Sequence, residues 1–286
     1  MGNILEVTEL NKSYKDFSLS DVSFTLPKDC ITGFIGINGA GKTTTIRSIL
    51  GLTGIDSGSI KIFGKDLSSS EHEIKNRIGV VLDECGFYDE LSMTEMKSII
   101  APSYSNWDEK TYKSYMDRFL LNPKQKISQL SRGMRMKFAL ALALSHEADL
   151  LIMDEPTSGL DPLVRSELLA IMAEYMKQEG KGVFFSTHIT SDLEKVADML
   201  ILIHDGRIVF ECEKDYLLDS FRLIKGDAKL LNAENKKLFL RIQSNDFGFT
   251  GITNKTNEVQ NAIQDVLVEK PSIEDIMIAH IEGGKR

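Results

Sequence analysis

One segment near the start of the chain restricts the possible folds more than any other. A glycine-rich turn at 36–43 follows a short apolar run at 31–35 and leads into a helix-favouring stretch at 44–50. Glycines let successive backbone N–H groups turn inward, and a helix N-terminus directly after them adds positive potential. A buried strand, such a turn and a helix together make a phosphate-binding loop. The segment therefore predicts an α/β domain with a site for phosphate groups.

Each residue type in this loop has a chemical reason. Lys42 is placed to reach the β- and γ-phosphates of a nucleotide, and the Thr43 hydroxyl can ligate Mg²⁺. A plain glycine-rich turn with a lysine nearby is the alternative, which the flanking strand and helix disfavour. The predicted nucleotide contacts are Asn38, Gly39, Ala40, Gly41, Lys42, Thr43 and Thr44.

Two carboxylates follow a buried-type strand at 150–153. Because an open parallel sheet presents the carboxyl ends of its strands to a ligand, Asp154 is predicted to hold the Mg²⁺ shell. Glu155 is predicted to orient or deprotonate the water that attacks the γ-phosphate. A solvated turn is the alternative for two isolated acids, and the phosphate loop favours the catalytic interpretation.

The remaining pattern divides the chain into two predicted domains, 1–215 and 216–286. Near-continuous apolar runs at 183–185 and 199–203 are typical of parallel strands buried on both faces. Between about 84 and 145 the spacing becomes helical, beginning with a capping box at Ser92 and Glu95 and ending with a helix at 136–145.

The second predicted domain is small and of α+β type. It contains a strand at 236–242, a loop rich in Asn, Gly and Thr at 245–257, and a final helix. That helix follows Pro271, carries a capping box at Ser272 and Asp275, and stops at Gly283.

Composition excludes several classes of protein. Lys and Arg number 34 against 42 Asp and Glu, so the net charge of -8 gives no basic footprint for nucleic acid. No window reaches the ~18 apolar residues that a membrane-spanning helix needs, and residues 1–12 carry no targeting pattern. We expect a cytoplasmic protein with no nucleic-acid partner.

Further motifs follow in a fixed order: Leu130-Ser131-Arg132-Gly133-Met134, then Ser158-Gly159-Leu160-Asp161, then Ser186-Thr187-His188. With the phosphate loop and the strand before Asp154, they make residues 4–215 resemble the ATP-binding subunit of ABC transporters. The resemblance implies an α/β P-loop ATPase core with a mainly parallel sheet, an antiparallel β subdomain and a helical insert.

The resemblance also implies a head-to-tail dimer in which each ATP lies between one subunit's phosphate loop and the other's signature. Ser131 and the Gly133 backbone would face the γ-phosphate from across the interface. His188 would contact that phosphate and Asp161 would couple the two sites. Tyr14 matches the aromatic residue that stacks on adenine, although an ordinary strand-end tyrosine is the alternative.

Two departures from the family pattern stand out. Asp83 occupies the usual place of a glutamine; a carboxylate there could ligate Mg²⁺ or its water, but it cannot donate a hydrogen bond when ionised. The signature carries Arg132 for the usual second glycine and Met134 for the usual glutamine. These variants resemble the drug-resistance and peptide-export branch.

The resemblance thus implies an exporter ATPase that works with a separate multi-spanning membrane permease at the cytoplasmic face of the membrane. The helical insert would contact that permease, and the ATPase subunits would pair as a homodimer or a paralogous heterodimer. A non-transport ATPase acting on DNA or ribosomes is the main alternative. The acidic balance, the single ATP module and the 112 residues between Lys42 and Asp154 disfavour it. A regulatory subunit that hydrolyses ATP poorly is a third possibility.

Overall fold

The computed structural model describes residues 2–83 and 86–283, so that Glu84 and Cys85, where the predicted insert begins, lie outside the described residues. The chain divides into two compact units, Met1–Ile208 and Val209–Arg286. The first unit carries every predicted nucleotide motif, and the second carries a sheet of its own.

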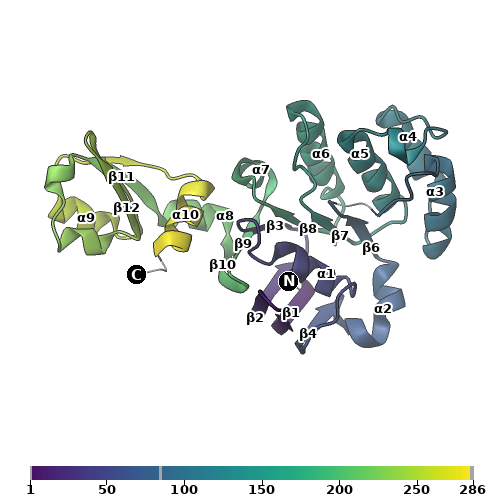
Figure 1. Ribbon diagram of the computed structural model, residues 1–286, viewed down its shortest axis with the longest axis horizontal. Coiled ribbons are helices and arrows are strands. Elements are labelled where there is room, and N and C mark those ends of the chain that lie inside the picture. The colour runs from purple at the N-terminus through teal and green to yellow at the C-terminus, as the bar shows by residue number, and fades with distance from the viewer. Residues whose placement is uncertain (1, 84–85, 284–286) are drawn as a thin grey trace. The chain divides into compact units, whose positions relative to one another are not determined.

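The central sheet has six strands (Figure 1), of which five lie in the first unit and β10 (Arg207–Glu213) runs across the boundary at Ile208. Its strands are, in order across the sheet, β10, β9 (Met199–His204), β3 (Ile31–Ile35), β8 (Gly182–Thr187), β7 (Leu150–Asp154) and β6 (Ile78–Val81). The pairs formed among β3 and β6 to β9 are all parallel. Strands β3, β7 and β8 are buried along their whole length, which confirms the predicted mainly parallel sheet.

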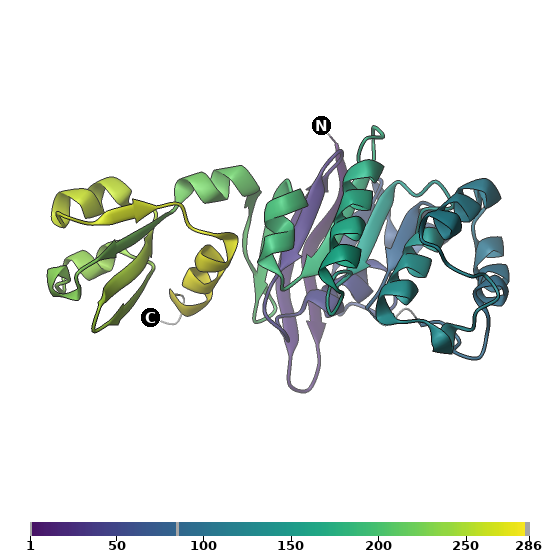
Figure 2. The ribbon, with the colours of Figure 1, turned by 90° about the horizontal axis from the view of Figure 1, so that it is seen from above.

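A second, antiparallel sheet packs beside the first. Its order is β2 (Ser18–Pro27), β1 (Asn3–Ser13), β4 (Ser57–Ile62) and β5 (Lys65–Asp66), and the long β1–β2 hairpin is purple in Figure 2. Three rings join the two sheets: Phe24, Phe34 and Phe184 lie with centroids 5.3–5.7 Å apart. This aromatic cluster fixes the position of β3, from which the phosphate loop continues.

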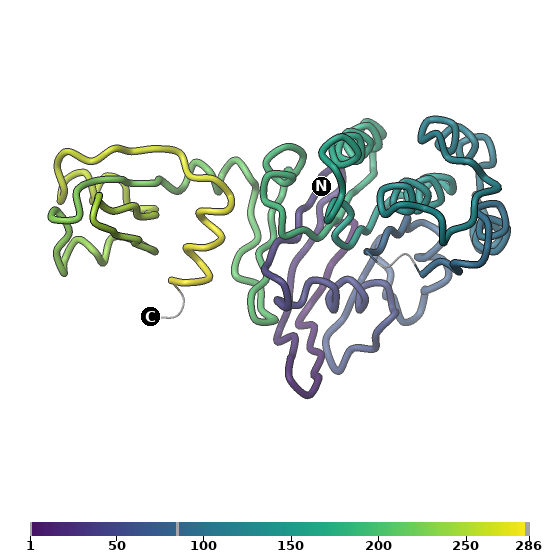
Figure 3. The backbone as a smooth tube through the Cα atoms, turned by 45° about the horizontal axis from the view of Figure 1, so that its top comes forward, coloured from purple at the N-terminus to yellow at the C-terminus, as the bar shows by residue number. Residues whose placement is uncertain are grey.

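Helices surround these sheets, and those of the insert gather at one end of the unit (Figure 1, Figure 3). The helices are α1 (Lys42–Ile49), α2 (Leu67–Lys75), α3 (Met93–Ile100), α4 (Glu109–Arg118), α5 (Arg132–Ala143), α6 (Pro162–Tyr175) and α7 (Thr190–Val196), with 3-10 turns at Ala101–Ser103 and Ile127–Gln129. The capping box predicted at Ser92 and Glu95 is confirmed at the start of α3.

The prediction for the start of α5 was wrong by four residues. The helix begins at Arg132 and not at 136, because the Ser131 hydroxyl accepts a hydrogen bond from Met134 N at 3.2 Å and acts as the N-cap. Gly133 has a low helix propensity, but the N-cap at Ser131 outweighs it. Arg132, Gly133 and Met134 are therefore the first turn of a helix.

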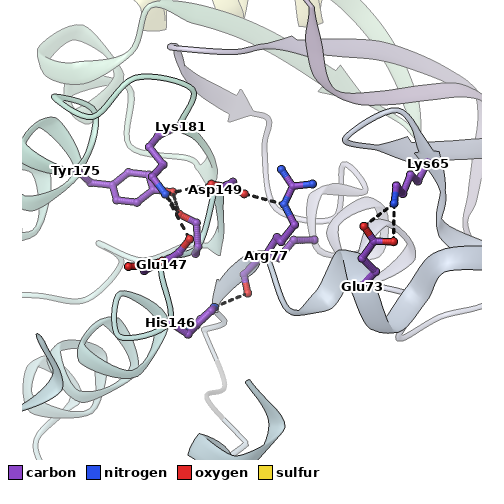
Figure 4. A network of polar contacts seen from close by, with 10 residues as sticks. Lys65, Glu73, Arg77, His146, Glu147, Asp149, Tyr175 and Lys181 are labelled. Atoms are coloured by element: carbon purple, nitrogen blue, oxygen red, sulfur yellow. Dashed lines mark hydrogen bonds and ion pairs between the residues drawn. The ribbon is translucent and has the colours of Figure 1, made fainter. Parts of the chain in front are cut away.

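At the amino ends of the parallel strands, a polar network holds the segments before β6, β7 and β8 together (Figure 4). Asp149 accepts hydrogen bonds from Arg77 Nε at 2.7 Å and from Lys181 Nζ at 3.1 Å. The buried His146 lies within 3.1 Å of the Ile78 carbonyl, and Tyr175 donates to the Ala148 carbonyl. This network lies at the sheet edge opposite the carboxyl ends.

The second unit is an antiparallel sheet with three helices. The sheet order is β12 (Arg241–Asn245), β13 (Gly248–Thr253), β11 (Arg222–Gly226) and β14 (Leu267–Glu269); the helices are α8 (Lys214–Ser220), α9 (Thr256–Ala262) and α10 (Ile273–Gly283), with 3-10 turns at Ala228–Leu230 and Asn235–Leu238. The capping box predicted at Ser272 and Asp275 is confirmed.

Two predictions in this unit were wrong. The strand predicted at 236–242 begins only at Arg241, after a 3-10 turn, and the predicted loop at 245–257 contains strand β13. A Cβ atom on Gly251 would lie 2.5 Å from the Phe239 ring, so this glycine lets the ring pack against the strand. Glycine often indicates a loop in a sequence, but here a glycine is needed within a sheet so that a ring can pack against it.

Candidate nucleotide-binding site

A pocket of about 580 Å³ opens at the carboxyl ends of β3, β6, β7 and β8. It brings together five segments of the sequence: the turn between β1 and β2, the phosphate loop, the loop after β6, the loop after β7 and the loop after β8. Its lining residues are Asp16, Phe17, Asn38, Gly39, Gly41, Lys42, Thr43, Thr44, Asp83, Glu155, Ser158 and His188. Ala40, between two lining glycines, is buried behind them.

The phosphate loop has the backbone geometry that an anion requires. Gly41 has a φ of 113°, and a Cβ atom there would meet Leu19 and Phe17 at less than 3 Å. Helix α1 follows directly, with neither a side-chain cap nor an acidic residue in its first turn. Its first N–H groups therefore remain for a ligand with negative charge.

Three predicted catalytic side chains meet at Glu155. Lys42 Nζ lies 3.2 Å from Glu155 Oε1 and donates to the Gly36 carbonyl at 2.8 Å. His188 Nδ1 lies 2.8 Å from Glu155 Oε2. Glu155 has a φ of 49°, its side chain is 13% exposed, and its Oε1 is buried without a hydrogen bond. A buried acceptor of this kind is suited to bind and polarise a water molecule.

Asp154 lies one residue before Glu155, buried at the end of β7. The Ser186 hydroxyl donates to Asp154 Oδ1 at 2.6 Å and accepts from the Glu155 backbone N–H at 2.9 Å. Ser186 thus fixes the Asp154 carboxylate and the Glu155 backbone against β8. Thr43 is exposed in the pocket.

Tyr14 is half-exposed on the β1–β2 hairpin and is not among the described residues that line the pocket, whereas Phe17 is. Tyr14 N donates to the Phe17 carbonyl at 2.8 Å, so the two aromatics belong to one tight turn. Sequence reasoning missed Phe17. The signal for it was its place beside Tyr14 in a turn that precedes a half-buried strand.

The signature residues lie in a different hollow of about 350 Å³. It is lined by Ser131, Gly133 and Asp161, among others, and by none of the residues that line the phosphate pocket. Asp161 caps α6, where its Oδ1 accepts from Leu163 N and Val164 N at 3.0 Å each. Within one chain, the two halves of the predicted ATP site are therefore separate.

A buried carboxylate that sequence reasoning missed connects two of the site's loops. Asp192 is fully buried and accepts hydrogen bonds from Thr157 Oγ1 and Arg165 Nε, at 2.6 Å each. Thr157 follows Glu155 by two residues, and Asp192 follows His188 by four. The available signal was spacing. Asp192 lies four residues after His188 and Arg165 lies four residues after Asp161, about one helical turn in each case.

The donor set fits Mg²⁺ and a nucleotide. A hydroxyl at Thr43 and carboxylates at Asp154 and Asp83 are oxygen ligands of the kind that Mg²⁺ takes together with substrate phosphates. Lys42 supplies a cation and α1 supplies N–H groups for the phosphates themselves. Glu155 Oε1, which has the ion pair with Lys42 but no hydrogen bond, lies in the same pocket.

Among the residues that the structure describes, no helix combines the length and apolar character needed to span a membrane. The family model described as ABC transporter matches residues 19–158. The bacitracin transport ATP-binding protein BcrA of Bacillus licheniformis is 33% identical to this chain over 306 positions, covering 99% of each.

Two other similarities cover about three quarters of the chain. The lantibiotic transport ATP-binding protein SrtF of Streptococcus pyogenes is 34% identical over 74% of this chain and 92% of its own. A solved structure described as the ATP binding subunit of an ABC transporter has a TM-score of 0.69 at 30% identity, over 76% of this chain and 92% of that one. This chain therefore belongs to the ABC transporter family, as an ATP-binding and ATP-hydrolysing subunit.

Proposed function

We propose that this ATPase powers export through a separate membrane subunit, using Mg-ATP bound in the phosphate pocket. The observation that carries the proposal is the convergence of Lys42 and His188 on the Glu155 carboxylate, at 3.2 Å and 2.8 Å. In this proposal Lys42 exchanges Glu155 Oε1 for the γ-phosphate of ATP. Glu155, released on that side, orients the attacking water and accepts its proton.

Other side chains position the substrate. Asn38, Gly39, Ala40, Gly41 and Thr44 offer loop and helix N–H groups to the phosphates, and His188 contacts the γ-phosphate. Thr43, Asp154 and Asp83 would hold Mg²⁺, which supplies charge neutralisation for the transferred phosphoryl group. We propose that Tyr14, the half-exposed aromatic residue of its turn, stacks on adenine.

The second half of the site is proposed to come from another ATPase subunit, identical or paralogous. Ser131 and Gly133 lie outside the phosphate pocket of their own chain, at the start of α5, where a hydroxyl and a helix N-terminus offer donors to an anion. A head-to-tail pair would bring them to the partner's γ-phosphate. Asp161 lies in the same hollow and would connect the two sites.

The membrane subunit is proposed to dock on the helical insert, at the cytoplasmic face of the membrane. An apolar groove of about 360 Å³ supports this, with Val80 and Leu82 on one side and Ile99, Ile100 and Ala139 on the other. It begins at β6, directly before Asp83, so a docked helix would be close to the nucleotide pocket.

For the cargo, the relatives named for bacitracin and lantibiotic transport support a peptide or drug. We propose export of an amphipathic peptide antibiotic. Residues 216–286 are proposed to be an accessory domain outside the catalytic site, because every motif residue lies before them.

The test is to purify the tagged chain from detergent-solubilised membranes of its own host and identify its partners by mass spectrometry. We expect a multi-spanning membrane protein, together with Mg-ATP hydrolysis that is lost in Lys42→Ala and kept in Lys61→Ala, an exposed lysine outside the pocket. Recovery with ribosomes or DNA, and with no membrane protein, would contradict the proposal.

A further inference from the structure

Asp83 and Arg132 form an ion pair between the loop after β6 and the first residue of α5. Asp83 lines the nucleotide pocket, and Arg132 lines the hollow that holds Ser131 and Gly133. The pair therefore connects the nucleotide pocket of a subunit to the signature hollow that the same subunit would present to its partner. Both side chains are nearly half exposed, at 44% and 47%, so the pair can open without unfolding its surroundings.

Arg132 also lies against the loop that leads to Asp161. Its Nε and Nη1 atoms are 3.4 Å from the position that a Cβ atom on Gly159 would occupy. Because Gly159 has no side chain, the guanidinium lies directly over the backbone of this loop. One cation thus contacts the loop after β6, the start of α5 and the loop before α6.

The charges of the two residues compensate each other. Arg132 is a cation in the first turn of a helix that holds no acidic residue there, a position that the helix dipole disfavours. Asp83 is a carboxylate in a pocket that already contains Asp16 and Glu155 and that must accept a polyanion. Pairing places negative charge at the helix N-terminus and neutralises a carboxylate that would otherwise repel the phosphates.

We propose that Asp83 and Arg132 are positioning residues that couple a subunit's own nucleotide to the signature segment it presents to the other subunit. Asp83 would be repelled by phosphates that enter the pocket and drawn to Mg²⁺ bound beside them, and either effect would change its ion pair with Arg132. Arg132 then moves the start of α5, with Ser131 and Gly133, and the loop before Asp161. This inference rests on the proposed function, which supplies the dimer.

A double-mutant cycle tests the coupling. We compare Asp83→Asn, Arg132→Gln and the double variant for kcat and KM of ATP hydrolysis, and for nucleotide affinity by fluorescence titration. Each single variant should lower kcat about three- to fivefold, the range for a half-exposed ion pair, with KM within about twofold. The double variant should be no slower than the slower single variant.

Two further measurements separate coupling from a loss of packing. Arg132→Lys keeps the charge and should recover most of the activity, and the effect of Arg132→Gln should shrink between about 50 mM and 500 mM salt. The matched control is Arg135→Gln in the same helix, whose ion pair with Asp89 at 2.7 Å lies outside both hollows and should leave kcat unchanged.

Additive effects in the cycle would overturn the proposal. So would a raised Mg²⁺ requirement in Asp83→Asn with a silent Arg132→Gln, which would leave Asp83 as a metal ligand alone. If Lys42→Ala retains ATP binding and hydrolysis, the proposed function itself fails. If Lys42→Ala loses them while the cycle is additive, only the coupling fails.

Discussion

In the proposed function, the chemistry of the site depends on Glu155. Its left-handed backbone and its contacts with Lys42 and His188 hold the carboxylate in the pocket, while Ser186 fixes its backbone N–H. A rigid acceptor beside two donors is set to align a water molecule without any large movement.

Replacing Glu155 by Gln should keep nucleotide binding and remove turnover. The amide has the same shape but accepts no proton, and loss of a general base lowers the rate by about 10²- to 10⁴-fold. Phosphate release and nucleotide titration measure the two effects, with the exposed Glu179→Gln as the control. Undiminished hydrolysis by Glu155→Gln would remove this residue from its catalytic role.

At the scale of elements, hydrogen bonds between side chains decide how the loops after β7 and β8 lie relative to each other. Asp192 on α7 accepts one hydrogen bond from Thr157, in the loop after β7, and another from Arg165 on α6. The position of His188 relative to Glu155 thus depends on a carboxylate that binds Thr157 and Arg165.

Asp192→Asn should therefore destabilise the fold as well as slow the reaction. The amide faces two donors with only one acceptor, and an unsatisfied buried group costs about 1–3 kcal/mol. Denaturant unfolding measures the loss, and Asp117→Asn on the exposed face of α4 serves as the control. A stability equal to that of the control would show that Asp192 does not hold these elements together.

The opposite ends of the strands respond to pH through Asp149. Burial raises the pKa of Asp149, but hydrogen bonds and charge from Arg77 and Lys181 outweigh this and lower the pKa below its ordinary value of 3.8. The carboxylate therefore contributes stability above that value, and the contribution is lost as pH falls through the lowered pKa.

Asp149→Asn should accordingly be less stable than the parent chain at neutral pH, by an amount that stays constant down to about pH 5 and declines below about pH 4. Unfolding free energies from pH 7 to pH 3 measure this. A difference that does not change over that range would mean that packing, and not charge, accounts for the effect.

For the whole molecule, the separation of the two half-sites leads us to expect assembly driven by ATP. Ser131 and Gly133 lie in one hollow and Lys42 and Thr43 in another, so one chain contains no complete site among its described residues. Two subunits that close around ATP would bury charges that repel each other unless the nucleotide and its cation are bound.

Glu155→Gln should form a dimer in the presence of Mg-ATP, because it binds the nucleotide without consuming it. Lys42→Ala should remain monomeric under the same conditions. Light scattering after size-exclusion chromatography distinguishes the two. Dimers that form equally without nucleotide, or in Lys42→Ala, would argue against ATP as the link between subunits.

Much of the first unit could be predicted because its signals are local. The apolar runs, the glycine turn before Lys42 and the capping box at Ser92 each act over a few residues, and the structure has them where the sequence indicates. The start of α5 could not be predicted in the same way, because the cap at Ser131 competes with Gly133. Strand β13 was missed because Gly251, which suggests a loop in the sequence, serves the packing of Phe239.

The sequence by itself determined the types of chemical group in this protein and the order of the elements that carry them, since turns, caps and hydrophobic periods depend on near neighbours. Tertiary structure alone decided which of these groups meet. The pairing of Asp83 with Arg132, 49 residues apart, and of Asp192 with Thr157, 35 residues apart, follows from the parallel sheet, which brings the ends of distant strands to one edge.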